Sequence, residues 1–282
     1  MDKCTEAEEF TLNKPEKPRV SIITATFNSA RFLPQAIESV AEQDYGNIEY
    51  IVVDGGSKDG TVSIIRNYNS VISKYVSEPD KGIYDALNKG INMASGDIVA
   101  FLHSDDFYAD TCIVSQLVKS ISAHSADGAY GDLLYISQNH AEKVIRKWHS
   151  RQFDPKSLKF GWMPPHPTLF LKKKVYLENQ LNDREFFDLS YNIAADYDFM
   201  LRIMKKQSTR LAYLPFALVK MRCGGVSNRS LKNIIQKMRE DYSAIKTNHV
   251  GGLFTLTMKN LSKLSQFRLM QHYDDPAMKK AQ

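Results

Sequence analysis

The sequence predicts an α/β protein with one mainly parallel mixed sheet flanked by helices, followed by a basic helical C-terminal extension. Short β-branched runs alternate with segments of helical periodicity over residues 19–102. Strand, helix and strand at this spacing require right-handed crossovers and therefore parallel strands. The 282 residues are enough for one large domain with an appendage, and the apolar content of 43% is that of an ordinary globular protein.

The first half of the chain alternates strand and helix patterns in a regular order. Short β-branched or apolar runs, which suit buried strands, occupy four places: residues 19–26, 48–53, 71–76 and 98–102. Apolar residues recur at helical spacing between these runs in three places: residues 33–40, 61–65 and 83–94. Pro34 suits the first turn of the first helix, and Thr61 is expected to cap the second.

The second half of the chain predicts a less regular arrangement. Residues 128–137 and 143–148 are expected to form a pair of strands. A proline-rich loop at residues 163–167 leads into an apolar stretch at 168–171. The remaining elements are expected in the following order: a helix at 194–204, a late strand at 211–221, a hinge or lid at 222–227 and helices after residue 231.

Composition and charge exclude several classes of protein. No stretch approaches 18 uncharged apolar residues, so no transmembrane helix is expected, and residues 1–10 lack the apolar core of a signal peptide. Cys4, Cys112 and Cys223 have no metal-binding spacing and indicate reduced thiols in a cytoplasmic protein. Residues 201–282 carry 16 Lys and Arg against 4 Asp and Glu. This basic part suits an anionic surface or a pyrophosphate-linked substrate, although a solvated helical face explains it nearly as well.

Polar side chains follow three of the predicted strands, at residues 26–28, 54–57 and 103–106. Ligands of open parallel sheets bind beyond the carboxyl ends of the strands, so these segments are expected to form one ligand site. Asp105 and Asp106 directly follow a buried strand, where adjacent carboxylates repel each other and lose water. Mg²⁺ or Mn²⁺ would relieve that cost, since both cations prefer oxygen ligands. The alternative is a solvated turn, in which Asp-Asp is common.

Asp54 begins a second candidate ligand segment. It stands at the end of the predicted strand 48–53, and the following Gly55 and Gly56 allow a flat ligand to approach the backbone. A carboxylate in this place can accept a hydrogen bond from a ring N–H of uracil or guanine. The segment matches neither the G-x-G-x-x-G dinucleotide pattern nor a P-loop. The alternative is a glycine-rich turn with a capping aspartate.

Four motifs, in order across residues 19–110, resemble the opening of the family-2 glycosyltransferases. The motifs span residues 21–28, 53–61, 78–90 and 94–106, and a weaker similarity extends to about residue 225. The resemblance implies a transferase with the GT-A type of fold that uses a nucleotide-diphospho-sugar and is usually inverting and metal-dependent. It also implies these divisions: a lead-in at 1–18, a GT-A domain at 19–225 with a nucleotide-binding half (19–110) and an acceptor half (111–225), and a helical basic extension at 226–282.

The resemblance assigns roles to residues of the first half. The implied nucleotide-binding residues lie in three motifs: Thr24 and Asn28 in the first loop, Asp54 at the base, and Asp80 and Lys81 near the ribose. Asp105 and Asp106 match the DxD-like motif, with Asp106 as the more direct ligand of Mg²⁺ or Mn²⁺. His103 departs from the pattern, because many relatives have an acidic residue there. It is expected to hydrogen-bond a sugar, to ligate the metal, or merely to be tolerated at the strand end.

Residues of the second half complete the implied site. Asp196 matches the family's catalytic base, which takes the proton from the acceptor hydroxyl. Ala195 replaces the family's preceding Glu, and Asp198 is the backup candidate; a helix N-terminus enriched in aspartate is the alternative explanation. His166 resembles the acceptor-side histidine and would contact acceptor or diphosphate. Arg222, in the predicted lid, would clamp the charge of the diphosphate.

The basic C-terminal extension suggests a contact with a membrane or with protein. Apolar residues gather on one side of a predicted helix there: Leu253, Phe254, Met258, Leu261, Leu264 and Leu269. Lys259 and Lys263 are expected on the opposite side. Such a helix can lie on an anionic membrane, which would place the protein at the inner face of the cell membrane, or pack on the catalytic domain or a second subunit. Nucleic acid is not an expected partner, because the sequence has no recognition motif.

The sequence therefore predicts an inverting, non-processive glycosyltransferase that moves a sugar from a nucleotide-diphospho-sugar to a hydroxyl of a sugar or lipid-linked sugar in cell-surface polysaccharide synthesis. The Gln-x-x-Arg-Trp motif of processive synthases is incomplete, since Glu240 replaces its Trp. One alternative is a sugar-1-phosphate nucleotidyltransferase, although residues 26–30 lack the glycine-rich, basic loop that it needs. Another is a catalytically inactive relative that only binds the nucleotide-sugar.

Overall fold

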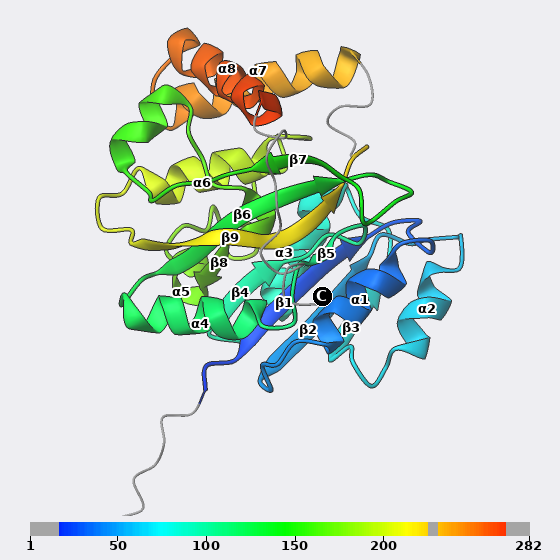
Figure 1. Cartoon of the computed structure of the whole chain (residues 1–282). Helices are drawn as coiled ribbons and strands as arrows, with labels where there is room; N and C mark the ends of the chain where they lie inside the picture. Colours follow the sequence, from blue (N-terminus) through cyan, green and yellow to red (C-terminus); the bar gives the residue numbers. More distant parts are fainter. Residues whose placement is uncertain (1–16, 225–230, 269–282) are drawn as a thin grey trace, which may run out of the picture.

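The computed structural model describes residues 17–224 and 231–268, which form a mixed nine-stranded sheet flanked by helices (Figure 1). The strands lie in the order β3-β2-β1-β4-β8-β6-β9-β5, and β7 pairs with β6. The bounds of the strands are β1 Val20–Thr26, β2 Ile48–Asp54, β3 Lys74–Ser77, β4 Ile98–Phe101, β5 Phe107–Tyr108, β6 Gly128–Ile136, β7 Val144–Trp148, β8 Phe170–Lys172 and β9 Leu211–Arg222. This architecture confirms the predicted α/β fold class.

The parallel half of the sheet brings the predicted polar segments together. β1 pairs in parallel with both β2 and β4, and Thr26 stands opposite Asp54 in the register. β2 pairs in parallel with β3, where Asp54 is level with Ser77. The segments that follow these four strands therefore emerge at one edge of the sheet, as parallel pairing requires.

Helices cover both faces of the sheet and bury two apolar cores. Consecutive residues of β1 belong to different cores: Ile22 packs with α1 and α4, and Ile23 packs with α3 and α6. This alternation follows from the two-residue period of a strand. The bounds of the helices are α1 Leu33–Ala41, α2 Thr61–Asn67, α3 Ile83–Met93, α4 Ile113–Ala123, α5 Lys173–Leu177, α6 Ala195–Met204, α7 Leu231–Thr247 and α8 Leu253–Arg268, with 3-10 turns η1 Pro155–Phe160 and η2 His166–Thr168.

The second half of the sheet is mixed because β8 runs antiparallel to both β4 and β6. β6 and β7 form the predicted pair of strands, and β9 lies parallel to β6. The short β5 pairs antiparallel with the end of β9, with Phe107 level with Lys220. The end of β9 therefore lies beside the turn that contains Asp105 and Asp106, which immediately precedes β5.

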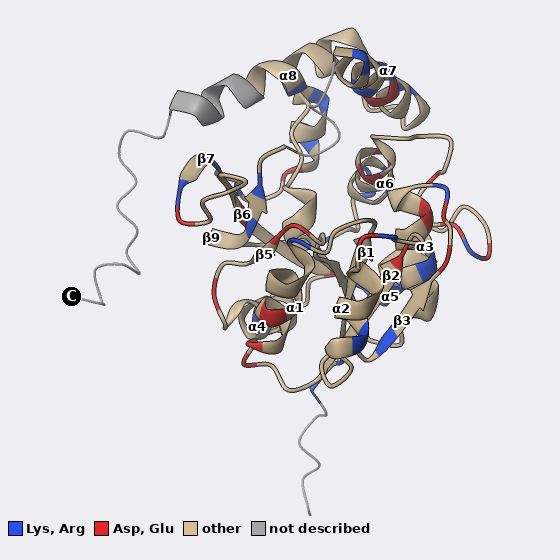
Figure 2. Cartoon of the chain, turned by 90° about the vertical axis from the view of Figure 1, so that its right-hand side faces the viewer, with Lys and Arg blue, Asp and Glu red and all other residues tan. Residues whose placement is uncertain are grey.

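The C-terminal helices α7 and α8 pack on the rest of the protein. α7 lies on α6, and α8 lies on η1 and β7 (Figure 1). Figure 2 shows lysine and arginine residues on both helices. The predicted boundary between the GT-A domain and the C-terminal extension at residue 225 stays a prediction. The helices that follow it nevertheless contact α6, η1 and β7 directly.

Lys259 lies on the side of α8 opposite the exposed apolar residues, as expected, and that side is buried. Its side chain is 4% exposed, and its Nζ lies 2.7 Å from Oδ1 of Asp241 on α7. The buried carboxylate draws the lysine inward, because a charge leaves water only where it finds a partner. Three of the predicted apolar residues stay exposed, namely Leu253, Phe254 and Leu261. The side chains of Lys263 and Leu264, and Leu269 as a whole, lie outside what the structure describes.

Smaller differences concern element ends. Thr61 is not a helix N-cap: Gly60, with φ 96°, occupies that position, and the Thr61 hydroxyl donates to Asp59 instead. β3 begins at Lys74, because residues 68–72 form a turn after α2. Residues 225–227 of the predicted lid lie outside the described part of the chain. Among the helices that the structure describes, none is long and apolar enough to cross a membrane.

Candidate active site

A cavity of about 500 Å³ opens where the parallel strands end. Titratable residues from five separate places in the chain line it: Tyr84 on α3, His103, Asp105 and Asp106 after β4, His166 on η2, Tyr176 on α5 and Asp196 on α6. Of the residues predicted for the site, Asp105, Asp106, His166 and Asp196 meet in this cavity. The other predicted site residues do not line the cavity: Thr24, Asn28, Asp54, Asp80, Lys81 and Arg222.

Asp196 stands in the first turn of α6, where both of its carboxylate oxygens are engaged. Oδ2 lies 3.0 Å from Nδ1 of His166, and Oδ1 accepts a 2.9 Å hydrogen bond from the Tyr84 hydroxyl. Burial alone raises the pKa of this carboxyl, but His166, Lys237 and the Tyr84 hydroxyl together hold it below the ordinary 3.8. Asp196 is therefore ionised at neutral pH and fixed in orientation, as a general base requires.

Asp198, the backup candidate for the base, lies away from the cavity. Its carboxylate forms a 2.9 Å ion pair with Arg202 and accepts a 2.7 Å hydrogen bond from Asn248 at the end of α7. Two residues further along a helix than Asp196, it faces another side. Its contacts indicate a structural role that joins α6 to α7.

His166 and His103 extend the contacts of Asp196 further into the protein. Nε2 of His166 lies 3.0 Å from Nε2 of His103. Burial lowers the pKa of both imidazoles, that of His103 to about 3, so the His103 ring is neutral at pH 7. One of these two Nε2 atoms carries the proton and the other accepts the hydrogen bond, so the tautomers of the two rings are coupled. The buried Nδ1 of His103 has no hydrogen-bond partner within the described residues.

Asp106 presents a buried carboxylate oxygen to the cavity. Its Oδ1 accepts a 3.2 Å hydrogen bond from the backbone N–H of Arg222, whereas Oδ2 has no hydrogen-bond partner among the residues described. Burial, with the neighbouring charge of Asp105, raises the pKa of Asp106 well above its usual range. Such an oxygen fits Mg²⁺ or Mn²⁺, since these cations are often held by one or two carboxylates together with substrate phosphates. The described part of the chain holds no cluster of three or more His, Cys, Asp or Glu suited to a metal.

Arg222 supports the turn of Asp105 and Asp106 from behind. It ends β9, is 6% exposed, and its guanidinium donates to the backbone oxygen of Asp105. The rings of Phe32 and Phe107 lie 4.7 and 5.2 Å from the guanidinium carbon. The expectation that Arg222 belongs to a lid and clamps the diphosphate does not match this position, because the strand pairing of β9 buries it. Its charge instead offsets that of the two carboxylates.

Asp54 is fully buried and holds its own turn together. Its Oδ2 accepts hydrogen bonds of 3.2 and 3.0 Å from the backbone N–H groups of Gly56 and Ser57, and one of 2.6 Å from the Ser77 hydroxyl. Its Oδ1 accepts from the Ser57 hydroxyl. Gly56 has φ 83°, a conformation that suits glycine. The carboxylate thus shapes the turn after β2, and its contact with a nucleotide base stays a prediction.

Thr24 and Asn28 differ in their relation to the first loop. Thr24 does not lie in that loop, so this expectation is wrong. It is a fully buried residue of β1 whose hydroxyl donates to the Leu102 carbonyl at 2.7 Å and lies 3.0 Å from the Tyr50 hydroxyl. Asn28 does lie in the loop, and its Oδ1 accepts a 2.9 Å hydrogen bond from the N–H of Lys58. Asn28 therefore joins the loop to the turn after β2.

Asp80 and Lys81 border the same edge of the sheet. The Asp80 carboxylate lies so close to Gly55 that an added Cβ there would be 2.5 Å from Oδ2. Its Oδ1 accepts a 2.9 Å hydrogen bond from the N–H of Gly82, just before α3. Lys81 is exposed, and its backbone N–H donates to Asp85. Their contact with the nucleotide stays a prediction.

Two residues that sequence reasoning did not assign lie beside the site. Glu240 on α7 accepts hydrogen bonds of 2.7 and 3.0 Å from the N–H groups of Ile193 and Ala194, and so caps the helix that carries Asp196. No local pattern signals this contact, because 46 residues separate Glu240 from Ala194. Phe27, directly after β1, is 61% exposed and offers a flat ring at the edge where the parallel strands end. The position of Phe27 in the motif at residues 21–28 was the sequence signal that could have identified it.

Comparisons with known proteins assign the family. The profile described as "Glycosyl transferase family 2" matches residues 21–186, more than half of the chain. The chain belongs to this glycosyltransferase family. An uncharacterized glycosyltransferase of Mycobacterium tuberculosis is 34% identical over 187 residues, which cover 66% of this chain and 68% of that protein. A PGL/p-HBAD biosynthesis glycosyltransferase of Mycobacterium bovis is 29% identical over 216 residues, 75% of this chain and 80% of that protein.

Solved structures of glycosyltransferases share the fold. S. aureus TarS 1–349 superimposes with a TM-score of 0.65 at 19% identity, covering 90% of this chain and 75% of that chain. Its complex with UDP-GlcNAc gives a TM-score of 0.63 at 18% identity, with coverage of 80% and 66%. In a second TarS structure, which has a longer chain, the match covers 39% of that chain. Mannosyltransferase PcManGT from Pyrobaculum calidifontis, in complex with GDP-Man and Mn²⁺, gives 0.55 at 18% identity and covers 95% of this chain and 79% of that chain. These similarities confirm the GT-A fold of this family-2 glycosyltransferase.

Proposed function

We propose that this protein is an inverting, non-processive glycosyltransferase that moves a sugar from a nucleotide-diphospho-sugar to a hydroxyl of a sugar or lipid-linked sugar acceptor. The observation that carries the proposal is the Asp196 carboxylate, which His166 and Tyr84 orient in the cavity that also holds Asp105 and Asp106. A base and a site for the leaving group therefore face the same space. The relative named for PGL/p-HBAD biosynthesis supports a role in cell-surface glycoconjugates.

Asp196 accounts for the acceptor side of the reaction. The acceptor oxygen forms a bond to the anomeric carbon while its proton passes to Asp196. The bond from the anomeric carbon to the diphosphate breaks, and its electron pair leaves with the diphosphate. Attack from the face opposite the leaving group inverts the anomeric configuration. Tyr84 and His166 hold the carboxylate toward the hydroxyl, which lowers the cost of orienting it during the reaction.

Asp106 and Asp105 account for the donor side. Mg²⁺ or Mn²⁺ held by Asp106, with Asp105 beside it, would stabilise the negative charge of the leaving diphosphate. Arg222 keeps this turn in place through the Asp105 carbonyl. The base of the donor lies at the edge formed by the turn after β2, where Phe27 can stack on it and Asp54 or Asp80 can accept a ring N–H. Structures of relatives with UDP-GlcNAc and with GDP-Man and Mn²⁺ support a nucleotide-sugar and a divalent cation.

The C-terminal helices support a peripheral membrane position. α8 exposes Leu253, Phe254 and Leu261, and the last 82 residues of the chain are strongly basic. Apolar and basic groups together favour an anionic lipid surface. We place the protein in the cytoplasm, at the inner face of the cell membrane, where a lipid-linked acceptor would be within reach. A homo-oligomer through the same helices stays an expectation.

The test of the catalytic base measures the release of nucleoside diphosphate from UDP-GlcNAc and from GDP-mannose with Mn²⁺. Asp196→Asn is expected to lower turnover by about 10²–10⁴-fold, the usual share of general-base catalysis, and to leave donor affinity unchanged. Asp183→Asn, which changes an exposed carboxylate, is the matched control. Full turnover in Asp196→Asn would show that another group is the base.

A second measurement concerns the metal. Thermal shift with UDP or GDP should increase when Mn²⁺ is added, since a ligand of the native state raises the melting temperature by mass action. Asp106→Asn is expected to abolish the Mn²⁺-dependent part of that shift, and a chelator should abolish it in the unaltered protein. A shift that Mn²⁺ does not change in either protein would reject the metal assignment.

A further inference from the structure

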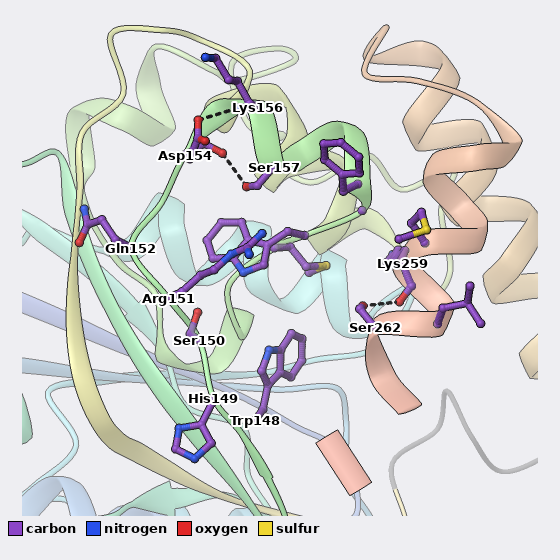
Figure 3. Close-up of a pocket in the computed structure, with 16 residues that line it drawn as sticks. Trp148, His149, Ser150, Arg151, Gln152, Asp154, Lys156, Ser157, Lys259 and Ser262 are labelled. Atoms are coloured by element: carbon purple, nitrogen blue, oxygen red, sulfur yellow. Dashed lines mark hydrogen bonds between the residues drawn. The ribbon is translucent and has the colours of Figure 1, made fainter. Parts of the chain in front are cut away.

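A second cavity, of about 970 Å³, lies between helix α8 and the segment that runs from β7 to η1 (Figure 3). Both tryptophans of the chain, Trp148 and Trp162, line it. The rest of the lining combines cations with apolar side chains, including Arg151, Lys156, Phe160, Met163, Met258 and Leu261. The catalytic roles derived above use none of these residues.

Arg151 and Lys156 give this cavity a positive charge. No carboxylate of the described residues lies within 4.0 Å of either cation. Asp154, the one carboxylate among the described lining residues, accepts a 2.9 Å hydrogen bond from the backbone N–H of Lys156 and caps η1. The lining therefore favours an anionic ligand, and a guanidinium suits phosphate because it can donate two parallel hydrogen bonds.

The two tryptophans have different surroundings. Phe153 stacks on Trp162, with ring centres 5.9 Å apart and planes 20° apart, and the edge of Tyr130 meets it at 6.1 Å. Arg151 lies 5.8 Å from the same indole. Trp148 has no aromatic ring contact among the residues described, and Figure 3 shows it pointing into the space beside α8. Trp148 is half-buried, and an indole that lines a cavity can pack against the C–H face of a sugar ring.

The cavity opens onto an exposed apolar rim, which consists of Phe160, Leu261, Phe254 and Leu253. Phe160 and Leu261, 52% and 51% exposed, also line the cavity. Phe254 is 62% exposed and meets Phe160 edge to face at 6.1 Å, and the adjacent Leu253 is 68% exposed. A contiguous apolar patch marks a binding surface. Because this rim adjoins cations, it suits a ligand that carries an anionic group next to an apolar chain.

The second cavity lies close to the candidate active site. Met163 lines the second cavity and His166 lines the first, and three residues of chain span at most about 11 Å. Lys259, on the wall of the second cavity, lies 3.1 Å from the ring centre of Tyr197, the neighbour of Asp196. The two cavities therefore lie near each other, on either side of the segment from Met163 to His166.

We propose that this cavity binds the phosphate and the first apolar carbons of a phospholipid-linked sugar acceptor. Arg151 holds the phosphate, Trp148 packs against the sugar, and the apolar rim holds the lipid chain. The use of this ligand as an acceptor rests on the proposed function, whereas its binding does not.

The test uses n-dodecyl phosphate below its critical micelle concentration, with inorganic phosphate and uncharged n-dodecyl maltoside for comparison. Tryptophan fluorescence reports binding, because both tryptophans line the cavity. Dodecyl phosphate is expected to bind saturably and at least tenfold more tightly than either comparison probe. Arg151→Gln should weaken it at least tenfold, whereas Arg66→Gln, on the exposed face of α2, should not change it. Phe160→Ser should weaken dodecyl phosphate and not inorganic phosphate.

Three results would overturn the proposal: no binding of dodecyl phosphate by the unaltered protein, equal affinity for the charged and uncharged probes, or unchanged affinity in Arg151→Gln. The thermal shift with UDP or GDP, measured on the same variants, reports on the active site separately. If the unaltered protein does not bind dodecyl phosphate but shows the thermal shift with UDP or GDP, the cavity proposal is rejected and the proposed function stands. Dodecyl phosphate binding without any nucleotide shift would reject the proposed function and leave the cavity standing.

Discussion

Replacing Asp241 by asparagine is expected to lower the free energy of unfolding by about 3–5 kcal/mol, because two lysines lose the carboxylate between them. Asp241 is 1% exposed, with Nζ of Lys259 at 2.7 Å and Nζ of Lys237 at 3.0 Å. At an effective dielectric constant of 20, a pair of charges 2.7 Å apart attracts by about 6 kcal/mol. Lys237, 24% exposed, can turn into water. Lys259, 4% exposed, cannot, so most of its attraction is lost.

The matched variant Lys259→Met separates the pair from general disruption of the helix. It leaves Asp241 in its ion pair with Lys237, so its cost should be smaller, about 1–3 kcal/mol. The double variant Asp241→Asn/Lys259→Met removes both charges of the buried pair. It is expected to be more stable than Asp241→Asn alone, because no lysine is then left buried opposite a neutral group.

Urea unfolding of the four proteins, followed by far-UV circular dichroism, measures these differences. Tryptophan fluorescence, recorded in parallel, reports the docking of α8, since Trp148 and Trp162 lie in the cavity beneath it. The reasoning would be refuted if the loss of unfolding free energy in the double variant equalled the sum of the two single losses within about 0.5 kcal/mol. The contact between Asp241 and Lys259 would then contribute nothing to holding α8 on the protein.

Two further predictions concern stability. Gly90→Ala should lower the free energy of unfolding by about 1–3 kcal/mol, because the added Cβ would lie 2.3 Å from Cγ2 of Ile23. Gly46→Ala, where no atom lies within 4 Å of the added Cβ, should have little effect. Equal costs of the two variants in urea unfolding would contradict the close packing of α3 on β1. Burial alone would raise the pKa of Glu49, but its hydrogen bonds, first that from Lys74, lower it from 4.5 to about 2. Because this pKa is lowered on folding, the ionised Glu49 stabilises the fold above pH 4.5, and that stabilisation is lost as the pH falls toward 2. The urea midpoint of the unaltered protein should therefore drop over this pH range, and that of Glu49→Gln should drop less. Parallel pH profiles of the two proteins would contradict this prediction.

The sequence by itself determined the elements and the edge at which the site lies. Strand and helix signals depend on residues a few positions apart, so β1, β2 and β4 appear within a residue or two of their predicted bounds. Parallel pairing then brings the segment of Asp54 and that of Asp105 and Asp106 to one edge of the sheet without further information. The family motifs lie in these same segments.

Only the tertiary structure decided which side chains of those segments face the cavity. Thr24 belongs to the first motif, yet the alternation along β1 turns it into the core. Arg222 belongs to a segment typical of a lid, yet the pairing of β9 buries it behind the carboxylates. Asp196 meets Tyr84 across 112 residues of chain. No local pattern contains such a contact, because it depends on how α3 and α6 pack together.

The C-terminal helices show the same limit most directly. An amphipathic helix with a lysine opposite its apolar residues can lie on a membrane or pack on protein, and the pattern alone does not choose between them. Lys259 is buried because Asp241, on another helix, lies where the two pack together. Glu240, on the same helix, caps α6 and so positions Asp196. The sequence specifies that these side chains are charged, but the packing of the helices decides which charges meet, and that packing depends on the whole chain.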